Sequence, residues 1–192
     1  MDLIPLSYMK KRKIYVEKTQ SPVTLKEFLK QIEGEKKIYI FDLDGIEKDK
    51  PNLCTYQRLS GSYDLWVDFG PRNLGDVVDA TMAGATDITL RRNLCPQLYI
   101  SEIKGITENK LYENIDFAEG LSFGDVDGLV NFNSREEIER NFKHSDFFKR
   151  TSLKNKVYSY ELDLENRTYW ERFGVEGLLV DINKLKGLKN GF

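Results

Sequence analysis

The chain has 192 residues, enough for one domain with a continuous hydrophobic core that needs no disulfide or metal to stabilise it. Its composition, 40% hydrophobic and 31% charged, is typical of a soluble globular protein, so we expect a single domain over residues 1–192. The 29 basic and 31 acidic residues leave a net charge of −2, which argues against a nucleic-acid partner.

The first half of the chain alternates short apolar runs, which predict strands, with segments of helical periodicity. In the segment 22–32, Leu25, Phe28, Leu29 and Ile32 occupy positions i, i+3, i+4 and i+7 of a helix. The basic run 10–13 predicts a solvated turn, after which 13–16 returns as an extended flap. We expect strands at 3–9, 37–43, 63–69 and 88–90, and helices at 22–32, 52–59, 73–83 and 96–103.

The second half repeats this alternation less regularly. The glycine-containing stretch 118–128 takes the place of a helix. Ser134 with Glu137 three residues later is a capping-box pattern, which predicts that a helix begins there. We expect strands at 111–117, 129–132, 157–162 and 178–181, and short helices at 167–173 and 182–188.

Eight strand–helix units, one of them without its helix, predict the fold class. Strands that alternate with helices pair in parallel, because each parallel connection needs a crossover. Eight units favour a closed α/β barrel, although such barrels usually have about 250 residues and about 200 at the low end. We therefore expect a compact (β/α)8 TIM barrel, complete or incomplete, with a doubly wound open sheet as the alternative.

Signals for metals, cofactors and membranes are weak. Cys54 and Cys95 lack metal-ligand spacing, and the single histidine, His144, has no partner motif. No segment approaches the roughly 20 apolar residues that span a bilayer, and the first residues lack a signal-peptide pattern. We expect a cytoplasmic protein that uses no metal and no cofactor and has no membrane partner.

The segment Asp42-Leu43-Asp44-Gly45 ends an apolar run and is open to two interpretations. It resembles the nucleophile loop of a haloacid-dehalogenase-type phosphatase, in which Asp42 would be the nucleophile and Asp44 the acid or base. That chemistry also needs an acidic pair for Mg²⁺. The candidate pair, Asp125 and Asp127, lies in a polar loop without a preceding apolar strand.

A wider window favours the second interpretation, because several short motifs follow one another in order. Together they resemble the phosphoribosylformimino-5-aminoimidazole carboxamide ribotide isomerase family of histidine biosynthesis, over roughly residues 3 to 120. The matching segments are Ile4-Pro5, Asp42-Leu43-Asp44-Gly45 with Asn52, Asp68-Phe69-Gly70-Pro71-Arg72, Ala83-Gly84-Ala85 with Ile88, and Asn114-Ile115-Asp116-Phe117-Ala118-Glu119-Gly120.

The resemblance implies a barrel of the ribulose-phosphate-binding type that carries out an Amadori aldose–ketose rearrangement. That reaction needs two opposed carboxylates, at the ends of strands one and five. Asp116 matches the carboxylate of strand five, whereas Tyr8 stands where strand one should supply an aspartate. Asp42 or Asp44 would assist Asp116 in this scheme.

The resemblance also implies a phosphorylated sugar or ribotide as the small-molecule partner. Gly70, Arg72, Arg91 and Arg92 are the expected phosphate-binding residues. Two of the three glycines after the third strand are replaced, and Arg91-Arg92 replaces a Gly-Thr pair. These departures leave a second interpretation open, a non-catalytic or repurposed barrel that serves binding or assembly.

Overall fold

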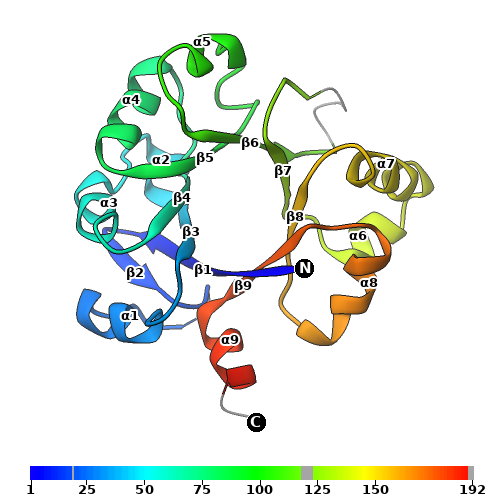
Figure 1. The fold of residues 1–192 in the computed structure, drawn as a ribbon, viewed down its shortest axis with the longest axis horizontal. Helices are drawn as coiled ribbons and strands as arrows, with labels where there is room; N and C mark the ends of the chain where they lie inside the picture. Colours follow the sequence, from blue (N-terminus) through cyan, green and yellow to red (C-terminus); the bar gives the residue numbers. More distant parts are fainter. Residues whose placement is uncertain (19, 118–122, 190–192) are drawn as a thin grey trace.

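In the computed structural model, which describes residues 1–18, 20–117 and 123–189, parallel strands form a closed ring with helices around it (Figure 1). Each barrel strand pairs with the next one along the chain, and the last pairs with the first, Leu6 lying opposite Asp181. This ring confirms the (β/α)8 class, shows that the strands are complete, and excludes the open sheet. The barrel strands are β1 (Asp2–Lys10), β3 (Lys37–Asp42), β4 (Asp64–Asp68), β5 (Ala85–Leu90), β6 (Lys110–Ile115), β7 (Gly128–Asn131), β8 (Val157–Tyr160) and β9 (Gly177–Asp181).

Side-chain caps fix where several of the surrounding helices begin. The predicted capping box is present, since the Ser134 hydroxyl accepts from the Glu137 amide and the Glu137 carboxylate accepts from the Ser134 amide. Thr24 with Glu27 forms the same box at α1. The helices are α1 (Leu25–Gln31), α2 (Leu43–Lys48), α3 (Leu53–Leu59), α4 (Leu74–Met82), α5 (Ile100–Lys104), α6 (Arg135–Glu139), α7 (Phe142–Ser152), α8 (Arg167–Arg172) and α9 (Ile182–Lys189), with a 3-10 turn at Leu164–Asn166.

The helices differ from those expected at several points, and α2, over Leu43–Lys48, was not predicted. The segment from Ser134 forms two helices, because Asn141 accepts a hydrogen bond from the Lys143 amide and so caps a new helix, α7. Helix α5 is shorter than predicted, since 95–98 forms a turn closed by the Leu98 amide on the Cys95 carbonyl. Of the stretch 118–128, residues 118–122 lie outside the described residues, and 123–127 form no helix.

The predicted flap is β2 (Lys13–Tyr15), which pairs antiparallel with β1. Lys11 and Arg12 make the turn between the two strands, with φ of 51° and 58°. Positive φ at both central residues is the geometry of a tight two-residue hairpin turn. The basic run is therefore a turn, as expected.

Aromatic rings pack the interior of the barrel. Trp66 lies at the centre, with its ring centroid 3.9 Å from Tyr112, 4.9 Å from Tyr158 and 5.0 Å from Tyr39. A second, larger layer of apolar side chains fills the space between the strands and the helices. Because side chains fill the interior, a ligand site is expected at the carboxyl ends of the strands, where such barrels usually have it.

Candidate functional site

A cavity of about 350 Å³ opens at the carboxyl ends of the strands. Its volume is at the lower end of the range for small-molecule sites, about 300–1,000 Å³. The wall is mixed, with aromatic rings, amides and charged groups that come from most of the barrel strands and from the segment after the flap. It is lined by Tyr8, Lys18, Phe41, Leu43, Arg91, Asn114, Ile115, Asp116, Phe132, Asn133, Glu137 and Tyr160, which we call the mouth cavity.

Asp116 and Tyr8 line this cavity from opposite sides of the ring. Tyr8 belongs to β1, the first barrel strand, and Asp116 directly follows β6, the fifth. In a closed ring of eight strands, the first and the fifth are four places apart in either direction. The structure therefore brings the predicted carboxylate Asp116 to the same cavity as the tyrosine at the first-strand position.

A buried carboxylate that the sequence did not indicate lies behind Tyr8. The Asp181 carboxylate, at the end of β9, is fully buried and accepts from the Tyr8 hydroxyl at 2.9 Å and the Tyr160 hydroxyl at 3.3 Å. The two tyrosine oxygens lie 3.0 Å apart. Burial raises the pKa of Asp181 above its ordinary value, although both tyrosine hydrogen bonds oppose this rise.

Arg91 occupies the floor of the mouth cavity. Its guanidinium donates to Asp68 Oδ1 at 2.8 Å and to Oδ2 at 2.6 Å, and lies over the rings of Phe41 and Phe132 at 5.1 and 5.8 Å. The Tyr39 hydroxyl also donates to Asp68, at 2.9 Å. Arg91 therefore lines the cavity at the strand ends, where a phosphate was expected to bind, but several of its N–H donors are already bonded to the buried Asp68 carboxylate.

Asp42 and Asp44 lie away from the mouth cavity. Asp42 is fully buried in the helix layer, where it caps α2 and accepts from the Asn52 amide at 2.7 Å and the Tyr56 hydroxyl at 2.5 Å. Asp44 accepts from the Arg12 amide and the Lys48 ammonium, both at 2.9 Å, and so attaches the flap turn to α2. Strand β3 ends at Asp42, so the pair does not share one face of a longer strand.

Through these contacts both carboxylates stabilise the fold. Burial raises the pKa of Asp42, and its hydrogen bonds to Tyr56 and Asn52 oppose that rise. The Asp42 carboxylate is fully buried and accepts hydrogen bonds from Asp44, Gly45, Asn52 and Tyr56, so a phosphoester has no open approach to it. The geometry therefore does not support the phosphatase interpretation.

Gly70 and Arg72 form a clasp between the loop after β4 and helix α2. The Arg72 guanidinium donates to the Gly70 carbonyl and, at 2.7 Å, to the Ile46 carbonyl. Gly70 has φ of 65°, and a Cβ there would come within 2.7 Å of Leu94. Neither residue lines the mouth cavity, so the structure does not group them with Arg91.

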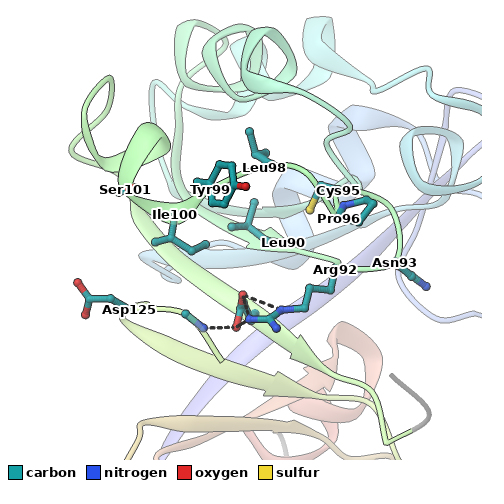
Figure 2. Close-up of a pocket in the computed structure, with 12 residues that line it drawn as sticks. Leu90, Arg92, Asn93, Cys95, Pro96, Leu98, Tyr99, Ile100, Ser101 and Asp125 are labelled. Atoms are coloured by element: carbon teal, nitrogen blue, oxygen red, sulfur yellow. Dashed lines mark hydrogen bonds and ion pairs between the residues drawn. The ribbon is translucent and has the colours of Figure 1, made fainter. Parts of the chain in front are cut away.

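Arg92 points to the other side of the sheet and borders a second cavity of about 730 Å³ (Figure 2). Its Nη2 lies 3.1 Å from Oε1 of buried Glu113, which also accepts from the Gly124 amide at 2.9 Å. Figure 2 shows that Leu90, Leu98, Tyr99 and Ile100 also line this cavity. Arg91 and Arg92 therefore cannot grip one phosphate together.

Within residues 1–18, 20–117 and 123–189, histidine, cysteine, aspartate and glutamate side chains form no group of three or more that could hold a metal ion. In the same part of the chain, every helix is too short or too polar to cross a bilayer.

Comparison with known proteins adds one firm result. No family model and no curated protein matches the chain. The solved structure described as "Native KDPGal structure" superimposes with a TM-score of 0.56 over 93% of this chain and 81% of the other, at 13% sequence identity. At this identity the likeness establishes the (β/α)8 barrel fold alone.

Proposed function

We propose that the chain is a barrel enzyme that carries out acid–base chemistry on a small sugar-type substrate in the mouth cavity. The observation that supports this best is that Asp116 and Tyr8 line one cavity from opposite strands. An aldose–ketose isomerisation needs a base that moves a proton between carbons and a second group that handles a proton on oxygen. Asp116 would be the base, and Tyr8 would contact the oxygen.

The resemblance points to an Amadori rearrangement, and the substrate of the family it names, the aminoimidazole carboxamide ribotide, carries a phosphate at each end. The charges of the mouth cavity refine the substrate. Lys18 is exposed at the rim, and Arg91 is already paired with Asp68, whereas Asp116 and Glu137 are acidic. One phosphate suits this wall better than two, so we favour a singly phosphorylated aldose or its amine adduct over a substrate with a phosphate at each end.

Exchange of the C2 proton of ribose 5-phosphate for solvent deuterium, followed by NMR, tests the proposed chemistry without knowledge of the true substrate. We expect the parent protein to catalyse the exchange and Asp116→Asn to slow it at least about 100-fold. Asp125→Asn, which changes an exposed carboxylate outside the mouth, is the control and should retain the parent rate. No exchange by the parent, with either this sugar phosphate or the ribotide, would remove the proposal.

A non-catalytic binding barrel is the second candidate. Two observations favour it, because they concern residues that the isomerase resemblance assigns to phosphate binding. The clasp holds Gly70 and Arg72 away from the mouth, and Arg91 is paired with Asp68. Binding of ribose 5-phosphate at the mouth, seen as NMR shifts of residues around Arg91 and Phe132 without any proton exchange, would decide for this candidate.

A further inference from the structure

The buried Asp181 has no role in the chemistry proposed so far. Its carboxylate is fully buried, but its two partners, Tyr8 and Tyr160, both line the mouth cavity. The three groups form a triangle, with oxygen separations of 2.9, 3.3 and 3.0 Å. Any proton that passes between Asp181 and a ligand in the mouth can therefore travel through one tyrosine hydroxyl.

The number of protons in this triangle decides what Tyr8 can do. When Asp181 is ionised, both tyrosine hydroxyls donate to it, and neither has a proton left for a ligand. When Asp181 is protonated, its O–H donates to one tyrosine, which releases the Tyr8 O–H to point into the cavity. The cluster thus has a resting form that only accepts hydrogen bonds and a protonated form that donates one.

The electrostatics of the cluster make Asp181 the group that changes its protonation. Burial raises the pKa of Asp181, the charge of Glu17, just after the flap, raises it further, and the two tyrosines and Lys184 of α9 lower it. Burial also raises the pKa of Tyr8 far above its ordinary value, and the Asp181 charge adds to this. Tyr8 therefore cannot lose its proton alone, and a proton that leaves it must be replaced.

We infer that Asp181 is the proton donor of the mouth and that Tyr8, held by Tyr160, conducts its proton to the substrate oxygen. In the step, the Tyr8 O–H bond breaks as a substrate O–H bond forms, while the Asp181 O–H bond breaks as a new Tyr8 O–H bond forms. The product is ionised Asp181 and neutral Tyr8, and reversal restores the proton. This inference rests on the proposed function and supplies the second carboxyl group, which comes from the eighth barrel strand in place of the first.

Carboxyl carbon NMR on protein labelled at aspartate tests the inference without any substrate. Asp181→Asn identifies the signal. We expect the Asp181 carboxyl to titrate above the ordinary aspartate value, near 3.9, and Tyr160→Phe to move its midpoint further up, because one hydrogen bond to the charged form is lost. Tyr158→Phe, on the same strand but deeper in the barrel, is the matched control and should leave the midpoint unchanged.

An Asp181 midpoint at or below about 3.9 in the parent would overturn the inference, and so would a midpoint that Tyr160→Phe fails to move. The pH profile of deuterium exchange gives the second readout. Tyr160→Phe should shift the alkaline limb of the profile, where the rate falls as Asp181 loses its proton, to higher pH. Asp116→Asn should instead lower the rate at every pH. If the parent shows no exchange, the proposed function fails, and the carboxyl titration still decides on the proton donor.

Discussion

Arg91 and Asp68 form a two-point ion pair at the base of the mouth cavity, with donor–acceptor distances of 2.8 and 2.6 Å. Asp68 is fully buried and the Arg91 side chain is 15% exposed, so each charge has lost most of its contact with water and is stabilised by the other. The pair also supports the rings of Phe41 and Phe132, over which the guanidinium lies. The pair therefore holds Arg91 in place against two aromatic rings that line the cavity.

Asp68→Asn should destabilise the protein by about 3–5 kcal/mol, because it leaves the Arg91 charge buried without its partner. Urea unfolding would measure the lost free energy of unfolding, provided that its dependence on urea concentration has the same slope in variant and parent. Lys104→Ala, which breaks an exposed pair with Asp125, is the control and should change stability by less than about 1 kcal/mol. Equal losses in the two variants would show that the Arg91–Asp68 pair is solvated.

Tyr56→Phe should destabilise the fold by about 1–3 kcal/mol without affecting the mouth. It removes the hydroxyl that donates to buried Asp42 at 2.5 Å and leaves that carboxylate short of one donor. The variant should still catalyse deuterium exchange at the parent rate, because Asp42 lies outside the mouth cavity. Tyr63→Phe, at a partly exposed position, is the control for loss of a tyrosine hydroxyl. A Tyr56→Phe variant that is stable but inactive would return Asp42 to the list of catalytic residues.

The barrel could be predicted because its signals are local. Apolar runs, helical periodicity and capping residues such as Ser134 each lie within a few neighbouring positions, and all eight barrel strands follow from them. The motif at Asp42 misled because β3 ends at that residue, after which its carboxylate caps α2 instead of continuing a strand face. The second cap, at Asn141, was missed, although an asparagine before an amphipathic segment is a helix-start pattern.

The missed part of the candidate site depends on contacts between distant segments. Asp181 lies 173 positions from Tyr8 and meets it only because β9 pairs with β1 and closes the ring. Arg91 and Arg92 are neighbours in sequence, but one binds Asp68 inside the barrel and the other binds Glu113 on the outside. Sequence order alone records neither relationship, although strand alternation argues against grouping two consecutive arginines.

Asp44→Asn should destabilise the protein at neutral pH and much less in acid. Burial raises the pKa of Asp44, but hydrogen bonds from the Arg12 amide and the Lys48 ammonium outweigh it, so the pKa is well below its ordinary value. The folded state then binds fewer protons than the unfolded state, and the stabilisation is present above about pH 4 and is lost as the pH falls through the folded-state pKa. The difference between the free energies of unfolding of variant and parent should shrink as the pH falls below about 4. Asp79→Asn, on an exposed part of α4, should show a small difference at every pH.

Gly84→Ala should destabilise the barrel more than Gly34→Ala, although both glycines have positive φ, 94° and 85°. A Cβ at Gly34 would meet nothing within 4 Å, so this variant should cost only backbone strain, about 1–2 kcal/mol. A Cβ at Gly84 would collide with Cβ and Oγ of Ser60 as well as adopt the strained conformation.

The collision can be separated from the strain by removal of the Ser60 side chain. In a Ser60→Gly background, Gly84→Ala should cost about as much as Gly34→Ala does in the parent, near 1–2 kcal/mol. Thermal and urea unfolding of the four proteins would complete the cycle. If Ser60→Gly gives no relief, the extra loss at Gly84 comes from the backbone of the turn between α4 and β5, and the close approach of α3 to that turn has no part in it.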